Sequence, residues 1–312
     1  MRYAIGIDLG GTNIAAGVVD GEYRLLRKDS VRTRAERPWQ EVVADMAALV
    51  RSLIEKSGLD PADCAGVGVG SPGVCQSGRG EVVYSNNLNW DHVPLCAEIT
   101  RLTGYPCRLS NDANCAALGE AWKGGGAGSR SSLFVTLGTG VGGGVILNGK
   151  ILGGAHGVGG EIGHITVSAP DKHPCTCGKR GCVEQYASAT GIVRVTKERL
   201  AACETPSSLR EKAETLTCKD VFDAAKAGDA LAAETLEQVF DYLGEALASA
   251  CCVCDPERII LGGGVTKAGE YLLRGAERHF EAHMFHACKG TEFSLATLGN
   301  DAGMYGAYRQ LA

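Results

Sequence analysis

The sequence predicts an α/β protein built from two related halves, and two observations carry that prediction. Short apolar runs with strand character alternate with longer segments of helical spacing, which indicates largely parallel sheets covered by helices on both faces. The segment 133–140 resembles the segment 5–12, an offset of 128 residues (133 − 5), and both copies have the order strand, glycine turn, strand, turn. We therefore expect a duplicated fold of two α/β domains around a cleft.

The first half contains strand-like runs between glycine turns and one clear helical pattern. In chain order, its predicted elements are strands over 3–9, 14–19 and 23–32, a helix over 39–57 and a strand over 65–69. Pro38 stands at the start of the helical pattern and Gly58 just after its end, as helix boundaries prefer. The three strands before the helix predict a β-meander at the start of the chain.

A glycine-rich segment precedes the second half. Residues 123–132 contain Gly124-Gly125-Gly126 and predict a hinge, because such a run does not hold regular structure. Around it we expect helices over 113–122 and 235–252 and a strand over 258–261. The predicted domains are a small one, residues 1–115 with 301–312, and a large one, residues 116–300, which includes the cysteine-rich segment 164–184.

Composition and charge narrow the function classes. The chain has 31 lysines and arginines against 36 aspartates and glutamates, a net charge of −5, which argues against a general nucleic-acid-binding protein. No run of about 18 apolar residues occurs, so we expect no membrane-spanning helix. A strand starts at Tyr3 with no signal-peptide pattern before it, and we therefore expect a cytoplasmic protein whose 14 cysteines are reduced.

The turn after the first predicted strand has the composition of a phosphate-binding loop. Its candidate residues are Asp8, Gly10, Gly11, Thr12 and Asn13. Backbone N–H groups in such a turn converge on phosphate oxygens, and the threonine hydroxyl adds a donor. Asp8 would repel phosphate directly, so we expect it to hold Mg²⁺, through water. The alternative is a plain hairpin turn with glycine at positive φ.

Two further glycine turns also follow strands. Gly138-Thr139-Gly140 superficially matches a dinucleotide fingerprint, but strand-like Val145–Leu147 follows it instead of a helix, which excludes a Rossmann NAD site. Gly262-Gly263-Gly264 follows a strand and precedes helix-like sequence, which suits a nucleotide base lying on backbone. In this order, the three turns resemble the phosphate-1, phosphate-2 and adenosine elements of the actin-like ATPase superfamily, a ribonuclease H-like fold.

Three cysteines crowd one loop, at Cys175, Cys177 and Cys182. Three thiolates and one imidazole complete a tetrahedral Zn²⁺ site, and both His164 and His173 are candidates for the fourth ligand. The alternative is a loop of free thiols. Cysteines on an apolar helix behave instead as small hydrophobes, and we expect this of Cys251, Cys252 and Cys254. We expect the same of Cys64, Cys75, Cys96, Cys107, Cys115, Cys203, Cys218 and Cys288.

Together these motifs resemble one known family. The run Gly160-Glu161-Ile162-Gly163-His164, followed by the three loop cysteines and Glu184, is similar to the signature of the ROK family (repressors, open reading frames, sugar kinases). The turns at 8–13 and 261–265 fit the family in the same order, and the resemblance extends to Gly303. It implies an actin-like fold of two domains, a structural Zn²⁺ with His164 as the fourth ligand, and ATP-dependent phosphorylation of a hexose.

The resemblance also implies a sugar site. By composition alone, Asn111-Asp112 before a predicted helix is an N-cap; in the family the aspartate is the catalytic base and the asparagine a sugar ligand. The helix N-terminus is expected to keep the Asp112 carboxylate ionised. The other positions that match sugar contacts of the family are Gly73, Asn89, Glu161, His164 and Glu184. For Gly73 and Asn89 the alternative is an ordinary turn. Zinc would hold one nitrogen of His164 so that the other meets the sugar.

The expected reaction is transfer of the γ-phosphoryl group of MgATP to the 6-hydroxyl of glucose, with Asp112 accepting the proton and domain closure excluding water. Glucose follows from overall similarity to family members that phosphorylate it. The alternatives are a kinase for N-acetylmannosamine, N-acetylglucosamine, fructose or allose, a polyphosphate donor, or a non-catalytic sugar sensor. DNA-binding members carry a helix-turn-helix ahead of the kinase-like body, which we do not expect here. The family is commonly oligomeric, so we expect a homodimer or homotetramer.

Overall fold

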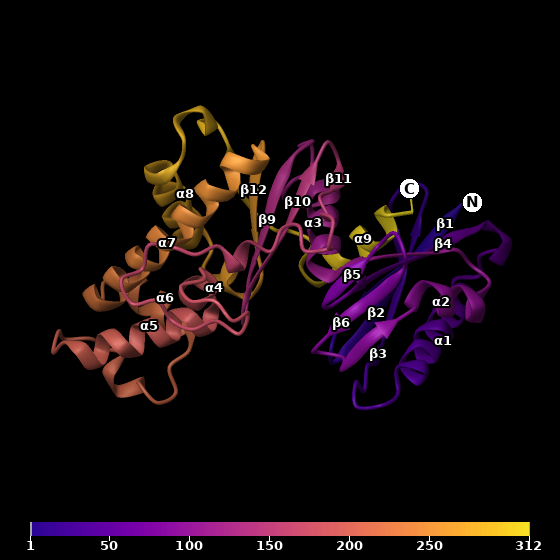
Figure 1. The fold of residues 1–312 in the computed structure, drawn as a ribbon, viewed down its shortest axis with the longest axis horizontal. Coiled ribbons are helices and arrows are strands. Elements are labelled where there is room, and N and C mark those ends of the chain that lie inside the picture. Colours follow the sequence, from indigo (N-terminus) through magenta and orange to yellow (C-terminus); the bar gives the residue numbers. More distant parts are fainter. Residues whose placement is uncertain (1, 312) are drawn as a thin grey trace. The chain divides into compact units, whose positions relative to one another are not determined.

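The computed structural model describes residues 2–311, which form two compact units (Figure 1). Unit 1 comprises Met1–Gly128, Gly144–Gly160 and Leu298–Ala312; unit 2 comprises Ser129–Gly143 and Glu161–Thr297. The domains predicted from the sequence, 1–115 with 301–312 and 116–300, differ from these units in the placement of 116–128, 144–160 and 298–300. Among the described residues, no helix combines the length and apolar character needed to cross a membrane.

Unit 1 is built on a five-stranded sheet. Its strand order is β3 (Leu25–Arg32), β2 (Asn13–Asp20), β1 (Tyr3–Leu9), β4 (Cys64–Ser71) and β8 (Cys107–Asn111). The predicted meander is confirmed, because β1 to β3 pair antiparallel, and β1, β4 and β8 run parallel. A smaller antiparallel sheet contains β5 (Val74–Gln76), β6 (Glu81–Ser85) and β7 (Trp90–Val93).

The prediction for the third strand was wrong at its start, which lies at Leu25 rather than Tyr23. The buried Asp20 carboxylate accepts hydrogen bonds from the backbone N–H groups of Glu22 (3.0 Å) and Arg24 (2.9 Å). These bonds hold a turn in which Tyr23 has φ of +67°, a left-handed conformation outside the usual range of strand residues. The aspartate therefore ends β2 and delays β3.

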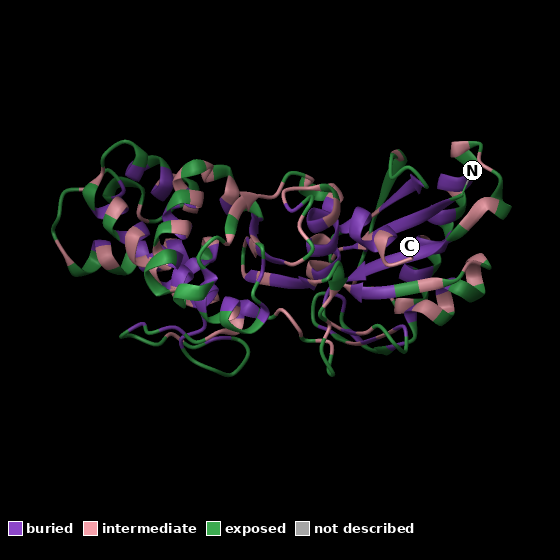
Figure 2. Ribbon diagram, turned by 90° about the horizontal axis from the view of Figure 1, so that it is seen from above, coloured by how far each residue is buried: buried purple, intermediate pink, exposed green. Residues whose placement is uncertain are grey.

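Four helices belong to unit 1: α1 (Trp39–Ser57), α2 (Leu95–Thr103), α3 (Asp112–Lys123) and α9 (Ala302–Arg309). The predicted bounds of α1 are confirmed, and Gly58 caps it in the left-handed conformation (φ +63°). Most of β1, β2 and β4 is buried (Figure 2). Successive side chains of β1 alternate between two faces: Ile5 and Ile7 join the core under α1, and Ala4 joins the aromatic residues of α9.

Helix α9 approaches its neighbours more closely than side chains allow. A Cβ atom on Gly6 of β1 would lie 2.0 Å from the Met304 carbonyl oxygen, and one on Gly68 of β4 would lie 1.8 Å from that of Ala307. A Cβ on Gly306 of α9 would lie 1.7 Å from the carbonyl oxygen of Cys115 in α3. Glycine is therefore required wherever α9 meets the sheet and α3.

The second five-stranded sheet has the order β11 (Lys150–Ile151), β10 (Val141–Leu147), β9 (Ser132–Leu137), β12 (Arg258–Gly262) and β13 (Glu292–Leu295). Strands β9, β12 and β13 run parallel. Counted along the chain, both sheets place their strands in the order third, second, first, fourth, fifth. This identity of topology confirms the duplication predicted from the resemblance of 5–12 to 133–140.

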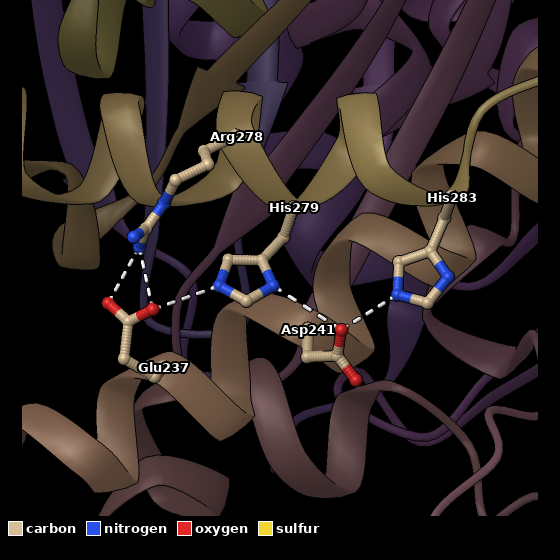
Figure 3. Close-up of polar contacts among 5 residues, drawn as sticks. All are labelled: Glu237, Asp241, Arg278, His279 and His283. Carbon is tan, nitrogen blue, oxygen red and sulfur yellow. Dashed lines mark hydrogen bonds and ion pairs between the residues drawn. The ribbon is translucent and has the colours of Figure 1, made fainter. Parts of the chain in front are cut away.

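The helices of unit 2 are α4 (Glu184–Ala187), α5 (Ala189–Ala202), α6 (Cys218–Lys226), α7 (Ala230–Cys254) and α8 (Glu270–His283). Polar side chains join α7 to α8 (Figure 3). Glu237 accepts from Arg278 (2.7 Å) and pairs with His279 (3.1 Å), and Asp241 contacts His279 (3.3 Å) and His283 (2.7 Å). Burial raises the pKa of Asp241, but its hydrogen bonds with the two histidines outweigh this and hold the pKa below its usual value.

Five cysteines outside the loop cluster are buried as predicted: Cys75, Cys115, Cys251, Cys254 and Cys288. The prediction was wrong for Cys252, which is exposed, and for Cys64, Cys96, Cys107, Cys203 and Cys218, which are only partly buried. Cys64, Cys107 and Cys218 each begin a strand or helix, where neighbouring elements cover one side only.

The glycine packing of α9 predicts the effect of a single methyl group. Gly306→Ala should lower the free energy of unfolding by about 1–3 kcal/mol or more, because its Cβ meets the backbone of α3, which cannot yield as a flexible side chain can. Gly78→Ala is the matched control, since a Cβ there meets nothing within 4 Å. Thermal melting of the two variants checks this; equal stability would show that α9 has room to move.

Candidate functional site

The candidate residues of unit 1 lie at the carboxyl ends of adjacent parallel strands. Asp8, in β1, pairs in register with Gly70 of β4, and Ser71 of β4 pairs with Asn111, the last residue of β8. Asp112 follows at once as the first residue of α3. In open sheets of this kind, ligands bind where the carboxyl ends of neighbouring strands meet. The sequence placed these residues far apart, and the sheet brings them to one edge.

The turn from β1 to β2 is held by backbone bonds and by one side chain that the sequence analysis missed. The Gly10 N–H donates to the Asn13 carbonyl oxygen (2.9 Å). Thr33, which is fully buried, donates its hydroxyl to the Gly10 carbonyl oxygen (2.6 Å) and its N–H to that of Thr12 (2.9 Å). Gly11 and Thr12 stay exposed, so their polar groups remain available to a ligand. A threonine after β3 carries no sequence signal for this role.

Asn111 ties α3 to the loop after β4. Its Oδ1 accepts from the N–H groups of Ala113 (2.9 Å) and Asn114 (3.3 Å), the N-cap expected from composition. Its Nδ2 donates to the carbonyl oxygen of Gly73 (3.0 Å), which has φ of +98°. A Cβ on Gly73 would lie 2.2 Å from the Tyr84 carbonyl oxygen, so glycine is required. The Asn111 side chain also hydrogen-bonds the Asp112 carboxyl group, which opposes the effect of burial on the pKa of that aspartate.

The two carboxyl groups at this edge both have raised pKa values. Burial and the charge of Asp112 raise the pKa of Asp8 to about 6. Burial also raises the pKa of Asp112, although the Ala113 N–H donates to its Oδ1 (2.8 Å) and opposes the shift. Desolvation therefore outweighs the hydrogen bonds at the start of α3, and the expectation that the Asp112 carboxylate is ionised stays a prediction. A divalent cation beside Asp8 would relieve both the burial and the repulsion.

Asp8 also depends on α9. A Cβ on Gly303, in the first turn of α9, would lie 2.6 Å from the Asp8 carboxyl carbon. Glycine at this position leaves room for the carboxylate against the helix backbone. The closing Gly303, which the sequence analysis treated only as the end of a resemblance, therefore shapes the site.

Asn89 lies in the exposed turn between β6 and β7 in the left-handed conformation (φ +53°), and its N–H bonds to the Asn86 carbonyl oxygen (3.3 Å). Asn89 therefore lies in a turn, which is the alternative that the sequence also allowed for it. The Asn87 backbone approaches Gly11, where a Cβ would lie 3.3 Å from its carbonyl oxygen. A role of Asn89 in sugar binding stays a prediction.

In unit 2, two glycine turns occupy neighbouring strand ends. Gly138-Thr139-Gly140 follows β9, and Gly262-Gly263-Gly264 follows β12, which pairs in parallel with β9. Gly263 has φ of +85°, and a Cβ there would lie 2.4 Å from the Leu137 carbonyl oxygen. The start of α5 holds the first turn, since Ala189 N–H donates to the Gly138 carbonyl oxygen (2.8 Å). Backbone N–H groups at such turns can bind phosphate.

A small cavity of about 160 Å³ borders the second of these turns. Its lining includes Gly264 and Val265 after β12, and Phe222 and Lys226 of α6. Lys226 donates to the carbonyl oxygen of Ala268 (2.8 Å), which fixes α6 against the segment that follows the turn. An apolar wall beside exposed backbone is the setting that a flat base needs, as the sequence predicted for this turn.

Glu184 and the run from Glu161 to His164 are built around the start of β10. Glu184 accepts from the Val141 N–H (3.0 Å), and a Cβ on Gly140 would lie 2.4 Å from its Oε2. Gly163 packs against the same strand, where a Cβ would meet the Val141 carbonyl oxygen at 2.0 Å. Glu161 is exposed and precedes the 3₁₀ turn Ile162–His164. One carboxylate oxygen of Glu184 thus binds the backbone of β10. The resemblance to the ROK family implied only a sugar contact for this residue.

Four side chains form a metal-binding geometry. The ligand atoms of His164, Cys175, Cys177 and Cys182 all lie within 4.8 Å of one another. The sulfurs of Cys177 and Cys182 are 3.6 Å apart, as are the Cys175 sulfur and Nδ1 of His164. In a tetrahedral site, Zn²⁺ bond lengths separate two sulfurs by about 3.8 Å and a sulfur from a nitrogen by about 3.6 Å. The residues present therefore fit zinc.

The other candidate ligand lies elsewhere. His173 pairs through Nε2 with Glu198 (3.4 Å) and packs its ring edge-on against Tyr186 at 5.8 Å. The structure therefore groups His164, not His173, with the three thiols. Nδ1 of His164 is the nitrogen beside sulfur, which leaves Nε2 for another partner.

Comparison with known proteins shows one family over the whole chain. A family model described as the ROK family matches residues 4–311. The glucokinase of Halalkalibacterium halodurans is 41% identical over 308 residues, covering 98% of this chain and 93% of that protein. The crystal structure of a ROK family glucokinase from Streptomyces griseus with glucose and AMPPNP has a TM-score of 0.76 and 35% identity, covering 99% and 98% of the two chains. An N-acetyl-D-glucosamine kinase of Yersinia pseudotuberculosis is 30% identical over 311 residues, covering 97% and 96%.

The raised pKa of Asp8 predicts that the stability difference between Asp8→Asn and the wild type depends on pH. Because folding raises the pKa of Asp8 from 3.8 to about 6, its contribution to stability is present below pH 4 and is lost as the pH rises through 6. Asp8→Asn should therefore be more stable than the wild type by about 1–3 kcal/mol at pH 8 and equal to it near pH 4.

Thermal melting of Asp8→Asn and of the wild type across this pH range measures the difference. Asp91→Asn, an exposed aspartate of the same unit, is the control and should show no such change. A difference of equal size at both pH values would contradict a raised pKa at Asp8.

Proposed function

Since this chain belongs to the ROK family and is an ATP-dependent hexose kinase, we propose that it phosphorylates the 6-hydroxyl of glucose, giving glucose 6-phosphate and ADP. The observation that carries the proposal is the pair of half-buried carboxyl groups, Asp8 and Asp112, at the carboxyl edge of the unit 1 sheet. The choice of glucose rests on similarity to proteins named glucokinase.

Asp112 is the proposed general base. Its Oδ1 accepts the Ala113 N–H, so Oδ2 is the oxygen left to accept a proton from the attacking hydroxyl. Burial raises the pKa of this carboxyl, and a higher pKa makes its ionised form a stronger proton acceptor. Asn111, bonded to Gly73 and to the start of α3, is the proposed ligand for a sugar hydroxyl.

Asp8 is proposed to hold Mg²⁺ with the phosphates of ATP. When bound, the cation neutralises the charge that develops on the phosphoryl oxygens. The chain contributes the carboxylate of Asp8 and the exposed turn of Gly11 and Thr12 beside it. In unit 2, the turns at 138–140 and 262–264 are the proposed contacts for the remaining phosphates and the adenosine, whose base would enter the cavity beside Phe222.

His164, Cys175, Cys177 and Cys182 are the proposed zinc ligands. When bound, zinc would supply structure: it would fix the loop and the tautomer of His164. Nε2 of His164, together with Glu161 and Glu184, is then proposed to bind sugar hydroxyls. Glu184 has its Oε1 3.9 Å from the Cys175 sulfur, so the loop that holds the metal also orients this carboxylate.

Another hexose is the alternative that a specific observation supports, since an N-acetyl-D-glucosamine kinase also aligns over nearly the whole chain. Release of ADP from MgATP should be measured with glucose, mannose, fructose, allose, N-acetylglucosamine and N-acetylmannosamine. The proposal expects the highest kcat/KM for glucose. A higher value for an acetamido sugar would assign the site to that sugar instead. Homo-oligomerisation and a cytoplasmic location stay predictions.

If Asp112 is the general base, its substitution should affect phosphoryl transfer and leave glucose binding nearly unchanged. Asp112→Asn should fold and bind glucose with a Kd close to that of the wild type, and kcat should fall about 10²- to 10⁴-fold, because an amide cannot accept the proton. Glucose titration and ADP release measure the two quantities. Retention of more than about a tenth of kcat would remove Asp112 as the base.

The zinc assignment predicts a linked loss of metal and stability. Cys177→Ala should lose bound zinc and lower the Tm by about 5 °C or more, because the binding free energy of the metal is partly folding free energy. Cys252→Ala, an exposed cysteine on α7, is the matched control and should keep both. Metal analysis and thermal melting measure the effects. A zinc-free wild type with unchanged melting and activity would contradict the assignment.

A further inference from the structure

Unit 1 contains a cavity of about 950 Å³ whose described lining shares one residue, Asn111, with the proposed reaction site. Four segments far apart in the sequence line it. They are 75–79 after the start of β5, 108–118 in β8 and α3, 148–157 around β11, and the end of α9 at 309–310. The volume lies in the upper part of the range of small-molecule sites, about 300–1,000 Å³.

Each of the four segments contributes one cation. These are Arg79, Arg108, Lys150 and Arg309, and none of the described residues that line the cavity is an aspartate or glutamate. The whole chain carries a net charge of −5, so the sign of this lining opposes that of the protein. Cations gathered in a concave site raise the local concentration of anions.

These cations are not neutralised by neighbours. Within residues 2–311, Arg79, Arg108 and Lys150 form no ion pair, and all three are exposed. The Arg309 guanidinium lies 5.4 Å from the centroid of the Trp122 ring, a contact that leaves its charge uncompensated. The guanidinium groups of the arginines therefore have N–H donors available for a planar or tetrahedral oxyanion.

A buried amide in the same lining lacks a partner. Asn114 of α3 is 4% exposed, and its Oδ1 accepts no hydrogen bond within the described chain. A buried acceptor without a donor destabilises the folded protein. A ligand hydroxyl at this end of the cavity would supply the missing donor, whereas a bare anion would not.

We propose that this cavity binds a small phosphate monoester with a hydroxyl-bearing body, such as a sugar phosphate. The four cations hold the phosphate, and the Asn114 amide takes a hydroxyl. Asn111 is the only candidate site residue among those described that line the cavity, and Asp112 is not part of its lining. A ligand held by the four cations would therefore lie beside the proposed sugar site and away from the proposed base.

Calorimetric titration of the full-length protein with glucose 6-phosphate tests the proposal, with saturating glucose present so that the sugar site is filled. Arg79→Gln and Arg108→Gln should each weaken binding about tenfold or more, as expected for loss of a charge-assisted hydrogen bond. The matched control is Arg27→Gln, an exposed strand arginine of the same unit outside the cavity, which should leave the Kd unchanged. Circular dichroism verifies that each variant is folded.

Three outcomes would overturn the proposal. The first is no binding by the wild type at millimolar glucose 6-phosphate. The second is an equal Kd in Arg79→Gln, Arg108→Gln and the wild type, which would place the ligand in the reaction site. The third is binding of inorganic phosphate as tight as that of glucose 6-phosphate, which would leave no role for Asn114 and the hydroxyl-bearing body.

Discussion

The close contact of α9 with the sheet and with α3 is the constraint on which unit 1 depends. Backbone meets backbone at Gly6, Gly68 and Gly306, so at these three points no side chain that could repack lies between the elements. The same helix places Gly303 against Asp8, and α3 begins with Asp112. The position of both carboxyl groups therefore follows from the packing of one short helix. Gly303 in α9 therefore helps to position the carboxylate of Asp8 in β1.

Each unit builds its glycine turns in the same way, with one side chain from another segment of the chain that anchors the turn. Thr33 holds the turn after β1, and Glu184 holds the turn after β9. Thr33 donates to carbonyl oxygens of its turn, whereas Glu184 accepts from an N–H group at the end of its turn. The duplication thus conserved the sheet and the turn, while the anchors come from unrelated segments of the chain.

The sequence could predict whatever is encoded by local pattern. The bounds of α1 follow from its apolar spacing with Pro38 and Gly58, and the cysteine loop follows from its spacing. The start of β3 could not be predicted, because it depends on hydrogen bonds from residues 22 and 24 to the Asp20 carboxylate. The rise of the Asp112 pKa could not be predicted either, since desolvation depends on packing that helix position alone does not reveal.

The cationic cavity carries no sequence signal for a related reason. Its four cations are far apart in the sequence, and only the fold brings them together: Arg79, Arg108, Lys150 and Arg309.

The product of the reaction is the most direct test of the proposed phosphoryl transfer. A ³¹P NMR spectrum of the product from MgATP and glucose should show ADP and a phosphate monoester coupled to the protons on carbon 6. Release of inorganic phosphate without a sugar phosphate, or a monoester at another hydroxyl, would contradict it.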